Sequence, residues 1–260
     1  MTQQPWILEH STWKDIAGTT CGAALLPWGA TEAHNTHLPY GTDTIQCTAI
    51  ARESARLAWE GGARVIALPA IPLGVQTGQL DIPFCINVNP STQLTLLRDI
   101  AKSLAGQGVP RLVILNGHGG NEFRAIVREL QPQVRLLLCV VDWYRALDPR
   151  RWFNEPGDHA GEMETSLMLH LAPDLVRPLN EAGEGRERKF TVRGMREGWA
   201  WAPRHWRSAT ADTGVGSPRG ATEAHGAEYF AALTRHLADF LVELCATPTG
   251  ELYEQGEDSR

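Results

Sequence analysis

Carboxylate and imidazole side chains gather in residues 31–43, which read TEAHNTHLPYGTD. Glu32 and His34 alternate, so an extended backbone would point both side chains the same way. Asp43 follows a turn containing Pro and Gly, and its two carboxylate oxygens could each reach a different metal ion. Carboxylates and imidazoles are ligands that zinc, manganese and iron accept. The segment therefore suits a metal site, although the same letters also suit a polar loop whose side chains satisfy one another.

A glycine-rich turn at residues 116–121 reads NGHGGN and carries His118 between two glycines. Glycines let the backbone approach another group closely. One interpretation is an anion-binding loop at a helix N-terminus, but the usual phosphate-binding patterns are absent. The other is a turn that projects His118 into a site. We favour the second because a histidine between glycines is poorly suited to core packing.

The third cluster, residues 158–165, reads DHAGEMET. If a helix begins here, His159 and Glu162 lie three positions apart and face the same way. Glu164 lies two positions beyond Glu162 and would face elsewhere, as a capping or supporting carboxylate. His159 could instead be a helix-start residue bonded to the backbone. We take His159 and Glu162 as the candidate site residues of this segment.

Apolar runs typical of strands alternate with helical patterns along the chain. The strand-like runs are residues 22–28, 63–69, 111–115 and 134–141, and the helical patterns are residues 44–60, 90–105, 122–130, 160–171 and 222–246. Such alternation predicts an α/β fold with a parallel sheet covered by helices on both faces. Sites in such sheets form at the carboxyl ends of strands. All three polar clusters follow predicted strands, so we expect them to build one site.

The 260 residues are expected to form one domain, residues 1–260. Residues 181–220 lack clear periodicity and are rich in tryptophan, which predicts a long excursion serving as a lid or subunit contact. The polar tail, residues 248–260, is expected to fray.

Composition excludes several classes of partner. The formal net charge is −6, which gives no reason to expect nucleic acid. No apolar run approaches the roughly 20 residues that a membrane helix needs, so no membrane partner is expected. The five cysteines are widely spaced without a C-x-x-C pair, and the N-terminus does not resemble a signal peptide. These features predict a cytoplasmic protein.

The three clusters, in this order, resemble the creatininase (creatinine amidohydrolase) superfamily. That family reads G-S/T-x-E-Q-H-G-P-H-L-P-x-x-T-D near the N-terminus, and residues 29–43 read GATEAHNTHLPYGTD. The family's NGHGGN is complete at residues 116–121, and its H-A-G-x-x-E-T-S-x-M-L matches residues 159–169. The resemblance implies a three-layer α/β/α creatininase-like fold with a mainly parallel central sheet. It also implies a two-metal site that hydrolyses C–N bonds.

The resemblance implies a role for each matched position. One divalent ion would be held by Glu32 and His118 and the other by His34, with Asp43 bridging. Zinc is the first expectation, with manganese or iron as alternatives, because oxygen and nitrogen ligands suit all three. Family members are usually homo-oligomers, so a homo-oligomer is expected, with a hexamer favoured.

This chain departs from the creatinine-hydrolysing branch of the family. The turn of that branch resembles NGHYEN, and its glutamate is a metal ligand, whereas Gly120 stands here and cannot coordinate through a side chain. We expect Glu162 to supply the missing carboxylate from the facing helix. The aromatic positions that stack creatinine in that branch hold Gly119 and Glu155 here. Creatinine is therefore not the expected substrate.

These inferences predict a metal-dependent amidohydrolase that cleaves a non-peptide amide or formamide of a small molecule with a metal-activated water. His159 is the candidate general acid, and Glu162 could take the water's proton if it is not a ligand. Three alternatives stay open: a peptidase trimming a small modified peptide, a two-metal phosphoesterase, and a non-catalytic metal-binding structural member. The shortage of Arg and Lys around the clusters argues against phosphoesters.

Overall fold

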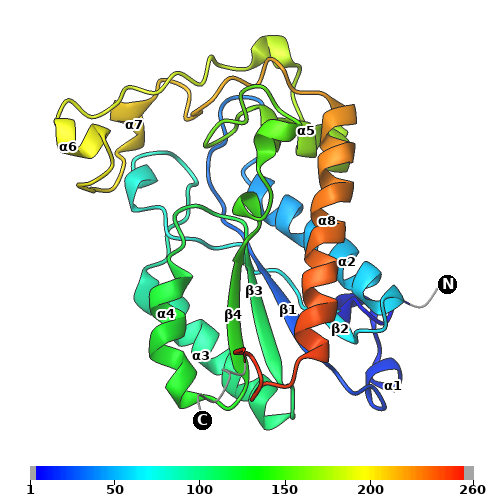
Figure 1. Cartoon of the computed structure of the whole chain (residues 1–260). Helices are drawn as coiled ribbons and strands as arrows, with labels where there is room; N and C mark the ends of the chain where they lie inside the picture. The colour runs from blue at the N-terminus through cyan, green and yellow to red at the C-terminus, as the bar shows by residue number, and fades with distance from the viewer. Residues whose placement is uncertain (1–3, 255–260) are drawn as a thin grey trace, which may run out of the picture.

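The sheet lies at the centre of a computed structural model that describes residues 4–254 (Figure 1). Its strands are β1 (Ala23–Trp28), β2 (Val65–Ala67), β3 (Arg111–Asn116) and β4 (Leu137–Asp142), all parallel in the order β2-β1-β3-β4. The register pairs Trp28 with Asn116 and Asn116 with Asp142, so three strands end at one edge. The predicted parallel sheet is confirmed.

Helices cover both faces of this sheet. On one face lie α2 (Thr42–Glu60) and α8 (Glu223–Ala246), and on the other lie α3 (Pro90–Gly106) and α4 (Phe123–Leu130). Side chains alternate along β1, so Leu25 packs into the α2 and α8 core while Leu26 packs into the α3 and α4 core. Each such leucine stabilises the fold by roughly 1.5–3 kcal/mol. The expected three-layer α/β/α architecture is confirmed.

Helix α5 (Glu162–Leu171) crosses α8 at very close range. A Cβ atom added at Gly226 would lie 1.9 Å from the carbonyl oxygen of Ser166. The N-cap of α8, Thr222, accepts the N–H of His225 with its side chain and donates its own N–H to the Ser166 hydroxyl. Helix α8 therefore holds the middle of α5 in place through Ser166.

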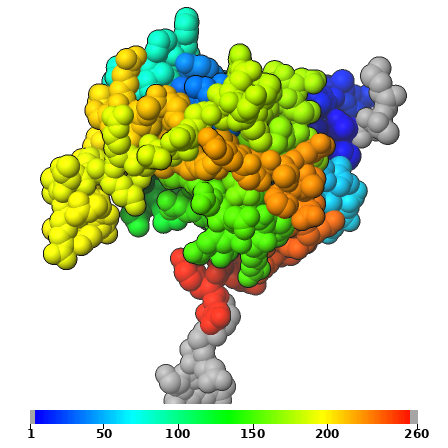
Figure 2. All heavy atoms as spheres, turned by 90° about the horizontal axis from the view of Figure 1, so that it is seen from above, coloured from blue at the N-terminus to red at the C-terminus, as the bar shows by residue number. Residues whose placement is uncertain are grey.

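Between α5 and α8 the chain makes a long excursion, part of which forms an extended arm on one side of the molecule. It carries the short helices α6 (Arg193–Arg196) and α7 (Trp206–Ala209), and Figure 2 shows the α6 region projecting from the body. The remaining short elements are α1 (Trp13–Ile16) and the 3₁₀ turns η1 (Leu8–His10), η2 (Thr77–Gln79), η3 (Gln131–Gln133), η4 (Trp143–Arg145), η5 (Pro149–Arg151), η6 (Pro173–Leu175) and η7 (Leu179–Glu181). The tail expected at residues 248–260 lies partly outside the described residues.

Between residues 4 and 254, none of the helices combines the length and the apolar character needed to cross a bilayer.

We predict that Gly226→Ala destabilises the protein. The added methyl would meet backbone, so α5 and α8 must separate, and such overpacking costs about 1–3 kcal/mol or more. For a chain of this size that lowers the thermal midpoint by roughly 2–12 °C, measured by differential scanning calorimetry. Gly106→Ala is the matched control, because no atom lies within 4 Å of a Cβ added there. Equal midpoints for the two variants would contradict the prediction.

Candidate metal centre

The loop after β1 places Glu32 and His34 above the sheet, and α2 supplies Asp43 from its first turn. Leu38 donates its N–H to the His34 carbonyl, which closes the loop. Asn35 has a φ of 55°, a left-handed conformation in which asparagine is enriched. His34 Nε2 lies 2.9 Å from Asp43 Oδ1, and all three site side chains are buried.

The NGHGGN turn brings His118 to the same carboxylates. Its Nδ1 lies 2.8 Å from Glu32 Oε1 and 3.1 Å from Asp43 Oδ2. A Cβ added at Gly120 would lie 2.2 Å from the Val75 carbonyl oxygen and 2.5 Å from His118 Nε2. The Val75 carbonyl thus occupies the space that a side chain at position 120 would need. This turn therefore cannot supply a carboxylate at that position.

His159 joins the cluster from a turn that precedes α5. Ala160 has a φ of 52° and Gly161 is extended, so the chain turns sharply before the helix begins. His159 Nδ1 lies 3.8 Å from Glu32 Oε1. Its ring packs on that of His34, with 4.1 Å between the centroids. His159 therefore lies against two of the candidate ligands.

The α5 carboxylate that faces the cluster is Glu164, where the sequence had pointed to Glu162. Glu164 lies within reach of an ion shared with His34 and Asp43. Glu162 Oε2 instead accepts the backbone N–H of Glu155 at 2.8 Å, and no potential ligand group in residues 4–254 includes Glu162. The sequence argument assumed a helix beginning about two positions earlier. Because residues two apart on a helix point to nearly opposite sides, Glu164 faces the cluster while Glu162 does not.

Each of the three histidines has one ring nitrogen at a backbone carbonyl and the other at the carboxylates. The nitrogen-to-oxygen distances are 3.1 Å from His34 Nδ1 to Glu32, 2.9 Å from His118 Nε2 to Val75 and 2.8 Å from His159 Nε2 to Ala33. When these nitrogens donate, the other nitrogen of each neutral ring directs a lone pair into the cluster. Metal-binding histidines in proteins are held in this way.

Three buried carboxylates, Glu32, Asp43 and Glu164, share this space. No ion pair of the described residues joins them to Lys or Arg. Burial disfavours the charged form of His34, but the neighbouring carboxylates of Asp43, Glu164 and Glu32 together outweigh it and raise the pKa of His34 to about 10. Burial raises the pKa of Glu164 to about 7. The cluster therefore requires positive charge, and a divalent cation would displace the protons that otherwise supply it.

The donor atoms form overlapping groups, each with its atoms within 4.8 Å of one another. One group is Glu32, Asp43 and His118, and a second is His34, Asp43 and Glu164. These two groups share Asp43 alone. A third joins Glu32, His34 and His159. Oxygen and nitrogen donors in two groups that meet at one carboxylate fit a pair of divalent ions.

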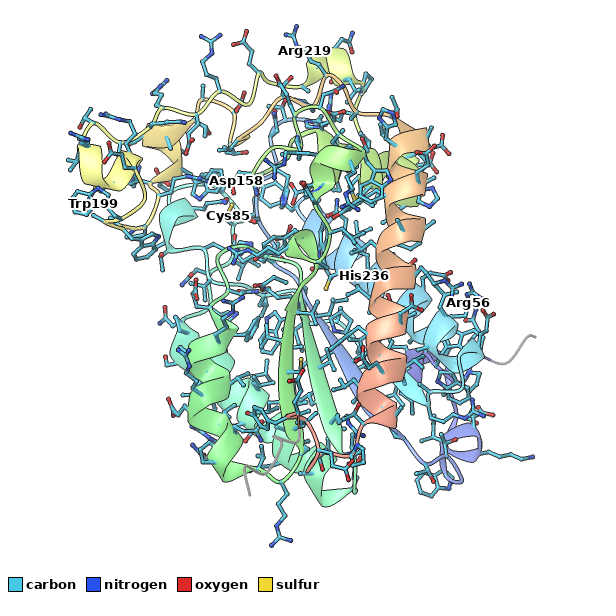
Figure 3. All side chains as sticks on the ribbon, in the orientation of Figure 1. Arg56, Cys85, Asp158, Trp199, Arg219 and His236 are labelled. Atoms are coloured by element: carbon cyan, nitrogen blue, oxygen red, sulfur yellow. The ribbon has the colours of Figure 1, made fainter. Side chains whose placement is uncertain are left out.

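Gln79, in η2, is a supporting residue that the sequence did not indicate. Its side-chain amide donates to Glu32 Oε2, and its amide oxygen accepts from Cys85 Sγ at 3.0 Å. Cys85 Sγ in turn accepts the N–H of Ala33 at 3.2 Å. Figure 3 labels Cys85 beyond the carboxyl ends of the strands. No spacing pattern in the sequence links η2 to Glu32, so only the folded chain brings them together.

We predict that added zinc stabilises the metal-free protein and that Glu164→Gln weakens this effect more than Glu162→Gln. A ligand at 100 times its Kd stabilises by about 2.7 kcal/mol, or roughly 5–11 °C in a chain of this size. Thermal midpoints and metal content after dialysis measure both effects. Glu162→Gln is the matched control from the same helix turn. A larger loss in Glu162→Gln would contradict the assignment.

Comparisons with known sequences match this chain to one protein family. The sequence model of the Creatininase family, described as creatinine amidohydrolase, matches residues 9–241. A relative from Mycobacterium tuberculosis named mycofactocin precursor peptide peptidase is 33% identical over 245 residues, covering 90% of each chain. A creatinine amidohydrolase from Pseudomonas putida is 30% identical over 191 residues, which is 64% of this chain and 71% of that protein.

Solved structures show the same likeness. A putative creatinine amidohydrolase from Bacteroides fragilis superposes with a TM-score of 0.91 at 39% identity, covering 97% of this chain and 100% of the other. A manganese form of creatininase superposes with a TM-score of 0.76 at 24% identity, covering 92% and 98% of the two chains, and this likeness shows the fold.

Proposed function

Because this chain belongs to the creatininase family, we propose that its buried cluster holds two divalent metal ions and hydrolyses a small-molecule amide or formamide. The chain is an amidohydrolase of C–N bonds other than ordinary peptide bonds. The observation that carries the proposal is the pair of ligand groups that share only Asp43. A carboxylate common to both groups would allow two ions to lie close enough to act on the same substrate.

One ion would be held by Glu32, Asp43 and His118, and the other by His34, Asp43 and Glu164. Zinc is the first candidate, with manganese or iron as alternatives, because the donors are oxygen and nitrogen. When bound, the ions lower the pKa of water toward about 7 and polarise an amide carbonyl. Gln79 fixes the orientation of the Glu32 carboxylate through its amide donor.

His159 would carry the proton that the leaving nitrogen receives. Its Nε2 is committed to the Ala33 carbonyl, so Nδ1, which faces Glu32, is the atom that would hold this proton. Glu162 is bonded to the backbone of Glu155 outside the cluster. On this proposal Glu162 would therefore not be placed to take a proton from water at the cluster.

The space beside the NGHGGN turn favours a substrate other than creatinine. A Cβ added at Gly119 would meet no atom within 4 Å, so that side of the turn is open where the creatinine-hydrolysing branch has an aromatic ring. A second candidate is the trimming of a small modified peptide. It is favoured by the relative named as a peptide peptidase, whose alignment covers 90% of this chain against 64% for the creatinine amidohydrolase.

A substrate panel tests the proposal. We predict that zinc- or manganese-loaded protein cleaves N-formyl amines or lactams, that a chelator abolishes the cleavage, and that creatinine is turned over poorly. Product amine is measured by derivatisation. Cleavage of short peptides alone would establish the second candidate. Cleavage of phosphoesters alone, or absence of stoichiometric metal after loading, would overturn the proposal.

His159→Ala tests the assignment of the acid. Loss of a general acid costs about 10²–10⁴-fold in rate, so we expect kcat to fall by that amount while metal content is retained. His236→Ala, an exposed residue on α8, is the control. Unchanged turnover with bound metal would show that His159 does not carry the proton. The homo-oligomer and cytoplasmic location expected from the sequence remain predictions, tested by light scattering and by fractionation.

A further inference from the structure

An aromatic side chain from the distant arm packs directly on His159. The rings of Trp206 and His159 lie 4.6 Å apart at their centroids, with 57° between their planes. The other side of the imidazole faces His34 at 4.1 Å. Trp206 is itself only partly buried, so it stands between His159 and solvent. The candidate acid is thus enclosed by a residue from the irregular segment that follows α5.

Arg204 fixes Trp206 from the solvent side. Its guanidinium lies 4.8 Å from the Trp206 ring centroid, a distance at which a cation attracts an aromatic face. Arg204 also pairs with Asp158 at 2.8 Å and with Glu187 at 3.2 Å. Asp158 immediately precedes His159 in the chain. The same cation therefore ties the indole to the backbone segment that carries the acid.

Helix α7 packs on η2 through a close approach of the two backbones. A Cβ added at Gly78 would lie 1.9 Å from the Arg204 carbonyl oxygen and 3.1 Å from Trp206 Cδ1. Arg207 donates to the Asp81 carbonyl at 2.7 Å and pairs with the Asp81 carboxylate at 3.2 Å. Because η2 also carries Gln79, the arm rests on the same turn that supports Glu32. The approach depends on the absence of a side chain at position 78.

We propose that α7 covers the active site, as a roof formed by Trp206 over His159. We propose also that Trp206 selects substrates whose leaving amine is planar or apolar. The inference rests on the proposed function, because the amine side of the substrate is the side that His159 would protonate. An indole beside that nitrogen offers apolar and stacking surface to whatever the nitrogen carries. Neither Gly119 nor Glu155 supplies an aromatic surface. The aromatic surface beside His159 comes instead from Trp206, which lies in a different part of the chain.

The test reaction is the hydrolysis of a formamide, which consumes one water and breaks one C–N bond. The carbonyl carbon keeps the water oxygen as formate, and the nitrogen leaves as the amine with the proton from His159. Formanilide and N-methylformamide have the same acyl part and differ only in the amine, phenyl against methyl. Their ratio of kcat/KM therefore measures selection on the leaving side.

The experiment compares this ratio in the metal-loaded wild type and three variants. Trp206→Ala should lower the preference for formanilide by roughly 10–200-fold, the range that apolar pocket contacts supply, and Trp206→Phe should restore most of it. Trp201→Ala, whose side chain is 83% exposed on the same arm, should leave the ratio unchanged. An unchanged ratio in Trp206→Ala, or an equal fall in Trp201→Ala, would overturn the proposal.

Gly78→Ala tests the roof with Trp206 intact. Its methyl would displace the Arg204 backbone, so the ratio should fall as in Trp206→Ala, whereas Gly106→Ala should not change it. If Gly78→Ala kept the wild-type ratio and fold, a roof seated on η2 would be excluded.

A readout that needs no turnover separates this proposal from the proposed function. Diethyl pyrocarbonate modifies accessible neutral imidazoles, and mass spectrometry gives its rate at His159 relative to the exposed His10. The relative rate should rise severalfold in Trp206→Ala and not in Trp201→Ala. If the wild type cleaved no amide on the panel, the proposed function would fail while this rate still tested the roof. Equal rates in both variants would overturn it.

Discussion

Three carboxylates buried in one small volume, without a Lys or Arg beside them in the described chain, are the constraint on which the rest of the structure depends. Glu32, Asp43 and Glu164 come from a loop, a helix start and a second helix, and each would cost several kcal/mol as an isolated buried charge. Only positive charge between them makes the arrangement stable. His34 and His118, whose pKa values the carboxylates raise, supply it as protons, and divalent cations would supply it with greater charge.

The backbone around the cluster is arranged to keep those histidines available as ligands. Carbonyl groups of residues 32, 33 and 75 each hold one ring nitrogen, which leaves the other facing the carboxylates. Gly120 is required because the Val75 carbonyl approaches it so closely. The same requirement removes any side chain from that position. The α5 carboxylate that faces the cluster is Glu164.

Much of this fold could be predicted because its elements follow strong local patterns. The four strands and five long helices were expected within a few residues of their observed bounds, since buried parallel strands are continuous apolar runs and the helices repeat every 3.6 residues. The convergence of Glu32, His34, Asp43 and His118 was also foreseeable, because parallel strands that end at one edge bring their following loops together.

The sequence was less informative where local patterns end. Spacing on an assumed helix favoured Glu162, but the left-handed turn at Ala160 delays the helix start and places Glu164 in the cluster. Nothing periodic in residues 181–220 shows that Trp206 packs on His159, because that contact depends on Gly78 and on ion pairs between distant segments. Contacts of this kind join segments that are far apart in the sequence, so no local sequence pattern predicts them.

The most direct test of the account is a crystal structure of the zinc-loaded protein with anomalous scattering measured at the zinc edge. The account predicts two peaks with an oxygen of Asp43 bound to each, and Glu164 coordinating at about 2.0–2.2 Å while Glu162 stays on the Glu155 backbone. A single peak, or two peaks with Glu162 as a ligand, would contradict it.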